Sequence, residues 1–185
     1  MSAFTVATAP ALGVRTAEVL VVGSASTGFS LSPDAYPRAF HDYSDIDVAV
    51  VSEELFDTVW KSLLEWGHPR RYRLPELESQ WFKDREDDVF WGWITPGRLY
   101  FDGLRYKEDL GGARDFRVKW FNFFRSLGTQ FPDSPLSSHE VNGRLYRTRA
   151  HLLAYHSESL RRLRYRLVKA ERGGTQWNSP QLSKR

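Results

Sequence analysis

Two short stretches of the sequence are the most informative about the fold: VLVVGS at residues 19–24 and SDIDVAVV at residues 44–51. The first is a valine-rich apolar run that ends in Gly-Ser, which is typical of a buried strand followed by a turn. The second carries Asp45 and Asp47 within an apolar run, and residues two apart on a strand point to the same face of the sheet. The sequence therefore predicts two strands, the second of which presents a pair of carboxylates.

The chemistry of these residues indicates a site for a metal ion and a phosphate. Two carboxylates on one face suit a divalent cation, and Mg²⁺ is usually bound through few carboxylates together with substrate phosphates. Gly23 has no side chain to obstruct a ligand that approaches the backbone, and Ser24 can donate a hydrogen bond to a phosphate. We therefore expect Asp45 and Asp47 to be metal ligands, and Gly23 and Ser24 to bind a phosphate.

The order of these features resembles the polymerase-β-like nucleotidyltransferase superfamily, over roughly residues 19–56. In that superfamily an apolar residue and Gly-Ser are followed by a later Gly, a loop and an Asp-x-Asp strand. The matching residues here are Val22-Gly23-Ser24, then Gly28, then Ser44-Asp45-Ile46-Asp47-Val48. The resemblance implies an α+β fold, a mixed sheet flanked by helices with a helical C-terminal part. It also implies Ser44 as a nucleotide-binding residue beside Gly23 and Ser24.

The activity that the resemblance implies is Mg²⁺-dependent transfer of a nucleoside monophosphate from an NTP to a hydroxyl of a protein, an RNA or a small molecule. Two Mg²⁺ ions held by carboxylates would neutralise the charge on the transferring phosphoryl group and align the attacking hydroxyl. Small free-standing members of the superfamily include antibiotic-modifying enzymes and components of toxin–antitoxin or phage-defence systems. By this analogy we expect a role in such a conflict system.

Three features depart from the superfamily pattern. The loop of residues 25–43 is long, and it could be a lid or an acceptor-binding element. Ala25 stands where minimal members often carry a basic residue. The superfamily usually supplies a third carboxylate from a later strand, and we take Asp102, after an expected strand at residues 98–101, as the leading candidate and Asp88 as the other.

Two other interpretations compete with the enzyme. If neither Asp102 nor Asp88 completes the site, the chain could be an inactive module that keeps the fold to bind a nucleotide, an RNA or a partner protein. Alternatively, the chain is an unrelated α/β domain in which Asp45 and Asp47 are structural.

The remaining pattern is mainly helical. Ser52 is expected to cap a helix that Gly67 and Pro69 end. The other expected elements are an irregular or partly helical lead-in at residues 1–16, a helix from Pro75 to about Arg85, strands at residues 88–94 and 98–101, a helix from Asp115 to Leu127, and a last helix capped by Asn142. We expect an α/β core at residues 1–112, a helical part at residues 113–174 packed on it, and a polar tail at residues 175–185.

Composition narrows the class of protein. The 185 residues are 41% hydrophobic and include seven Trp, so one packed domain with a small helical addition is expected. No run of about eighteen apolar residues is present, so no membrane span is expected. The N-terminus lacks the pattern of a secretory signal. The absence of cysteine excludes disulfides and thiolate metal sites and fits a cytoplasmic protein.

The C-terminal part of the sequence is basic. From Gly143 onward the only acids are Glu158 and Glu171, among many Arg and Lys. The last helix could therefore track a phosphate backbone, such as that of tRNA, or contact a protein acceptor. A solvated face whose arginine stems cover apolar residues explains the pattern equally well. His156 lies on the apolar side of this helix, and we interpret it as a hydrogen-bonded core histidine; no zinc site is expected.

Overall fold

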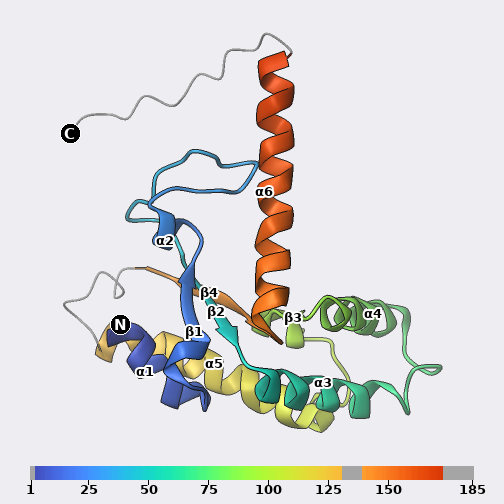
Figure 1. The fold of residues 1–185 in the computed structure, drawn as a ribbon. Coiled ribbons are helices and arrows are strands. Elements are labelled where there is room, and N and C mark those ends of the chain that lie inside the picture. The colour runs from blue at the N-terminus through green and yellow to red at the C-terminus, as the bar shows by residue number, and fades with distance from the viewer. Residues whose placement is uncertain (1–2, 131–138, 173–185) are drawn as a thin grey trace.

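The computed structural model describes residues 3–130 and 139–172 (Figure 1). Within these residues it contains six α-helices and one four-stranded sheet. The α-helices and strands are α1 Ala3–Leu12, β1 Val19–Val22, α2 Ser24–Thr27, β2 Ile46–Val51, α3 Glu53–Gly67, α4 Glu76–Phe90, β3 Trp93–Ile94, α5 Gly111–Gln130, β4 Val141–Tyr146 and α6 Arg149–Arg172. The 3₁₀ turns are η1 Thr16–Glu18, η2 Pro96–Leu99 and η3 Lys107–Leu110. None of the described helices is both long and apolar enough to cross a membrane.

The sheet is mixed, and its strand order is β1-β2-β4-β3. β1 pairs antiparallel with β2, β2 pairs parallel with β4, and β3 pairs antiparallel with β4. The expected α+β class with a mixed sheet is therefore confirmed. The two predicted strands, β1 and β2, are neighbours, so the Gly-Ser turn and the acidic strand come from adjacent positions in the sheet.

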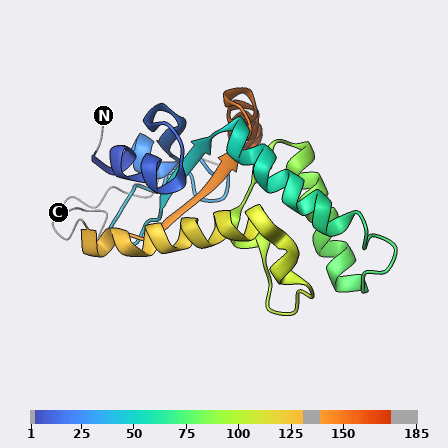
Figure 2. The ribbon, with the colours of Figure 1, turned by 90° about the horizontal axis from the view of Figure 1, so that it is seen from below.

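The two faces of the sheet carry different side chains, as the alternation in β2 predicts. Ile46, Val48 and Val50 are buried in the main core, which α1, α3 and α5 share. Ala49 and Val51 belong to a smaller cluster with residues of β4 and α6. Figure 2 shows the sheet between α5 on one side and α6, seen end-on, on the other. Asp47 alternates with these residues on the α6 side, where the sheet is only partly covered.

The helix after β2 forms as predicted. The Ser52 hydroxyl accepts a hydrogen bond from Leu55 N at 3.4 Å, which satisfies a backbone donor of the first turn. The inner apolar residues of α3 are buried, including Trp66, whose accessibility is 0%, whereas Trp60 and Leu64 are exposed. The helix ends at Gly67, where an added Cβ would lie 2.0 Å from the Phe82 ring of α4. A glycine is needed here because the two helices meet at this point.

The C-terminal half differs from the prediction at one central point. Asn142, expected to cap a helix, lies in β4, and the helix begins only at Arg149. β4 is an inner strand of the sheet, so a division at residue 112 separates it from the sheet to which it belongs. The part of the chain from residue 113 is thus not purely helical. Residues 131–138 and the predicted tail at residues 175–185 lie outside the described residues.

The region before α5 also differs from the prediction. α4 continues to Phe90, and only Trp93–Ile94 of the first expected strand forms β3. Residues 98–101 are expected as a strand, but residues 98 and 99 belong to the 3₁₀ turn η2, which packs on α5, and residues 100 and 101 follow it. Pro96 is the first residue of that turn, where its fixed φ favours a helical start over a hairpin.

Candidate functional site

The Gly-Ser turn and the acidic strand meet at one end of the sheet. Val22 of β1 pairs with Asp47 of β2, so the turn that follows Val22 lies beside the carboxylates. A Cβ added at Gly23 would lie 2.6 Å from Asp47 Oδ2, and Gly23 has φ +66°. Only glycine suits both the backbone conformation and this approach. The structure thus brings together Gly23 and Asp47, with Ser24 next in the chain.

β4 adds two residues to this face that the sequence analysis missed. The β2–β4 register places Asn142 beside Asp47 and Arg144 beside Ala49. Asn142 Nδ2 donates to Asp45 Oδ2 at 3.2 Å. Arg144 donates to Thr95 Oγ1 at 3.2 Å and to the Tyr155 hydroxyl, and its guanidinium lies 4.4 Å from the Tyr155 ring centroid. The signal was present, because polar and apolar residues alternate in Asn142–Tyr146, but Gly143 weakened it.

The positive charge near Asp47 is too small to offset the partial burial of its carboxylate. Solvent reaches both Asp45 and Asp47. The surrounding chain nevertheless removes enough water from Asp47 to raise its pKa, Arg144 opposes the rise, and the neighbouring charge of Asp45 adds to it. A cation held between the two carboxylates would relieve both unfavourable effects. This donor set therefore fits a divalent ion.

Replacing Asp47 by Asn should raise the midpoint of thermal unfolding near pH 8 by about 1–2 °C. The folded state binds the Asp47 proton more tightly than the unfolded state, so stability falls as the pH rises from the ordinary pKa of 3.8 through the folded-state pKa. Asn cannot ionise, so the variant does not lose stability in this way. Its higher unfolding midpoint relative to wild type should therefore vanish below about pH 4. The effect is small because the carboxylate stays accessible to solvent.

Circular dichroism melts of both proteins in EDTA, across this pH range, measure the effect. Asp42→Asn, the same change in an exposed loop residue, is the matched control. A lower midpoint for Asp47→Asn than for wild type at high pH would contradict the electrostatic account.

α6 forms a wall beside the carboxylate face. Tyr155 and His156 of this helix pack against Tyr146 of β4, with ring centroids 5.8 and 6.4 Å from it. Our interpretation of His156 as a hydrogen-bonded core histidine is wrong. The residue is half-buried, and its buried Nε2 has no hydrogen-bond partner in the described part of the chain. Burial, together with the charge of Arg144, lowers its pKa, so the imidazole is neutral near pH 7.

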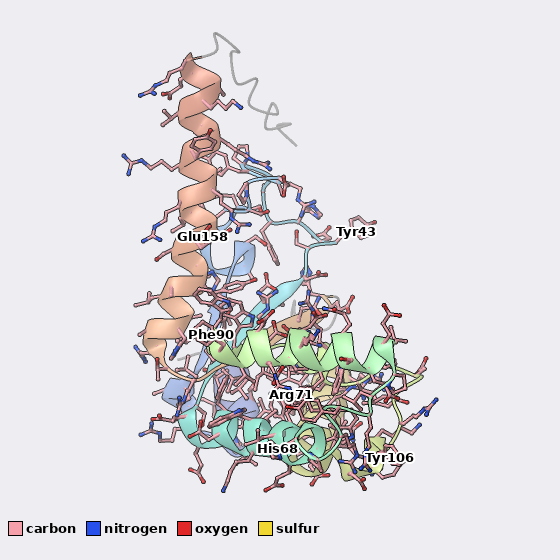
Figure 3. The ribbon with its side chains drawn as sticks, turned by 90° about the vertical axis from the view of Figure 1, so that its right-hand side faces the viewer. Tyr43, His68, Arg71, Phe90, Tyr106 and Glu158 are labelled. Atoms are coloured by element: carbon pink, nitrogen blue, oxygen red, sulfur yellow. The ribbon has the colours of Figure 1, made fainter. Side chains whose placement is uncertain are left out.

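The long loop of residues 25–43, called the insert below, is ordered against α6. After the short helix α2, its backbone closes through a bridge between Phe29 and Ala39. Asp34 in the insert forms an ion pair with Arg166 of α6 at 2.5 Å. Figure 1 shows the insert rising alongside α6 from the end of the sheet that bears Asp47. Tyr43, 94% exposed, projects into solvent where the insert returns to β2 (Figure 3).

The other predicted site residues either lie away from the carboxylate face or form hydrogen bonds within the loop that precedes β2. Ser44 is buried, and its hydroxyl accepts a hydrogen bond from His41 N at 3.1 Å. Asp102 follows η2, which packs on α5 at the opposite face of the sheet. Asp88 is buried, 3.0 Å from Arg85 Nε. No group of three His, Cys, Asp or Glu that could hold a metal occurs among residues 3–130 and 139–172.

A scan against protein-family models and searches of curated proteins and of solved structures find no match for this chain.

Proposed function

We propose that the carboxylate face binds Mg²⁺ and a nucleoside triphosphate and transfers the nucleoside monophosphate to a hydroxyl of an acceptor. The observation that carries this proposal is the contact between Gly23 and Asp47. It means that a turn suited to phosphate and a pair of carboxylates suited to Mg²⁺ open onto the same space. A structural Asp-x-Asp pair would instead be expected to find its counter-ions within the fold, yet neither Asp45 nor Asp47 has an ion pair within the described residues.

Each residue has a distinct part in the proposed chemistry. Asp45 and Asp47 would hold Mg²⁺, which neutralises charge on the phosphates and aligns the attacking oxygen. The Gly23–Ser24 turn would bind phosphate oxygens through the backbone and the Ser24 hydroxyl. Arg144 places a permanent positive charge behind Asp47 on the same face of the sheet. That charge would also favour a bound polyphosphate.

A second candidate function follows from Asn142. It lies on the strand next to β2, and the superfamily that the sequence resembles usually supplies a third carboxylate from a later strand. An amide oxygen can coordinate a cation, but an amide carries no charge and is a poor proton acceptor. An Asn at a position where the superfamily would have a carboxylate favours a module that binds a nucleotide without turnover. A role in a conflict system and a cytoplasmic location stay predictions under either function.

Incubation of the wild-type protein with each α-labelled NTP, Mg²⁺ and cell extract tests the two candidates. The enzyme should transfer label to an acceptor with Mg²⁺ present and not in EDTA. The binding module should instead show only a rise in the unfolding midpoint with Mg²⁺ and an NTP, by about 5–10 °C at a hundredfold excess over the dissociation constant. Absence of both label transfer and thermal stabilisation with all four NTPs would contradict both functions.

A further inference from the structure

The positive charge of this protein is concentrated on α6. This helix contains seven Arg or Lys residues and two Glu, a net charge of +5. The whole chain carries +3, so everything outside α6 sums to −2. A helix whose charge exceeds that of the whole chain, on an otherwise slightly acidic protein, is suited to a polyanionic partner.

The outer half of α6 lies beyond the sheet. At 1.5 Å per residue its 24 residues span about 36 Å, whereas the six residues of β4 span about 20 Å. The base of α6 packs on the sheet through Leu152, and further along an ion pair joins Arg166 to Asp34 of the insert. Figure 1 shows α6 continuing past the end of the sheet from which the insert rises. The outer half therefore extends beyond the end of the sheet at which Asp47 lies.

Some of the exposed residues of the outer half form a basic stripe, while exposed Arg164, Val168 and Glu171 lie outside it. Since successive helix residues are about 100° apart, six of them fall on one side of α6 within about 140°, away from buried Leu163. This basic stripe comprises Arg161, Arg162, Tyr165, Arg166, Lys169 and Arg172. Arg162 pairs with Glu158 and Arg166 with Asp34, while the other three cations have no ion pair within the described residues.

Tyr165 lies within the stripe and is 69% exposed. An aromatic ring among arginines is the combination that binds single-stranded nucleic acids, where the cations contact phosphates and the ring stacks on a base. An anionic membrane or an acidic protein surface would be attracted by the same charges but has no bases to stack on this ring. The stripe spans about 17 Å, which matches about five phosphates at 3.4 Å per strand.

We propose that the basic stripe of α6 binds the backbone of a single-stranded nucleic acid and that Tyr165 stacks on one of its bases. This inference rests on the proposed function and identifies the acceptor as a nucleic acid. The basic stripe would guide the strand along α6 and the insert to the carboxylate face. The binding itself needs neither Mg²⁺ nor an NTP, so it can be measured separately from transfer.

Fluorescence anisotropy of labelled single-stranded RNA and DNA oligonucleotides, titrated with the full chain in EDTA, tests the proposal. Arg161→Gln/Lys169→Gln removes two charges from the stripe. The control variant, Arg71→Gln/Arg73→Gln, removes two charges from the link between α3 and α4. Figure 3 labels Arg71, which lies far from the outer half of α6. The stripe variant should weaken binding about tenfold or more and lower the salt slope of log K by about 1.4; the control should weaken it less than about threefold.

The aromatic contact has its own control. Tyr165→Ala should weaken binding about 5- to 100-fold, whereas Tyr165→Phe should keep it, because both Tyr and Phe rings stack on bases. Equal losses in the two charge variants, an unaffected Tyr165→Ala, or equal displacement of the oligonucleotide by polyglutamate or by anionic vesicles would overturn the proposal. Asp47→Asn should bind the oligonucleotide as wild type does. Absence of label transfer from the wild-type protein, together with intact oligonucleotide binding, would count against the proposed function alone.

Discussion

Asp47→Asn is expected to abolish Mg²⁺-dependent label transfer, with a loss of about a thousandfold or more, and Asp45→Asn should do the same. Asn keeps the size of the side chain but removes the negative charge on which a Mg²⁺ site depends. A thousandfold loss corresponds to about 4 kcal/mol of transition-state stabilisation, within what a metal ion supplies at a transferring phosphoryl group. Initial rates of transfer from an α-labelled NTP, at saturating Mg²⁺, measure the loss.

Two comparisons make this result specific to the carboxylate pair. Asp42→Asn makes the same chemical change three residues before Asp45, in the exposed part of the insert, and should transfer label as wild type does. Because Asp47→Asn is expected to be slightly more stable than wild type, loss of transfer cannot be attributed to unfolding. Full activity in both Asp45→Asn and Asp47→Asn would exclude the carboxylate face as the site of transfer.

Gly143→Ala is expected to lower the unfolding midpoint by about 6–12 °C, or about 3 kcal/mol. A Cβ at this position would lie 2.2 Å from the carbonyl oxygen of Val48 and 3.0 Å from the Trp120 ring of α5. The first contact is with backbone in the middle of the sheet, so relief would require β2 and β4 to move apart. Thermal melts followed by circular dichroism measure the change.

Gly97→Ala provides the matched control. The nearest atom to a Cβ at Gly97 is Phe121 Cζ at 3.8 Å, an ordinary van der Waals contact. This variant should stay within about 0.5 kcal/mol of wild type. If Gly143→Ala were as stable as Gly97→Ala, β4 could not lie in this register beside β2, and the placement of Asn142 and Arg144 on the carboxylate face would be lost with it.

Local patterns predicted the parts of the fold that local forces determine. The alternation in β2 identified which face carries Asp47, because one-sided burial imposes a period of two on a strand. Ser52 identified the start of α3, since its hydroxyl satisfies a backbone donor three residues ahead. The meeting of Gly23 with Asp47 followed from the resemblance and from the two strands being neighbours.

Long-range pairing was the part that could not be predicted. β4 is separated from β2 by about ninety residues, and nothing within the segment at residues 141–146 shows that it pairs with Ile46–Val51. Asn142 indicates a helix cap, and Gly143 interrupts the alternation of a strand, although the glycine is there because Val48 and Trp120 leave no room for a side chain. For this reason the sequence pattern indicates Asp102, and no residue of β4, as the leading candidate for a third carboxylate.

A structure of the protein with Mg²⁺ and a non-hydrolysable NTP tests the central claim most directly. We expect a metal ion held by Asp45 and Asp47, with the phosphates on the Gly23–Ser24 turn. The contrary result is an NTP bound elsewhere with no metal at the carboxylates. The groove of about 330 Å³ lined by Arg15, Arg147 and Arg149, at the opposite end of β2, is such a place.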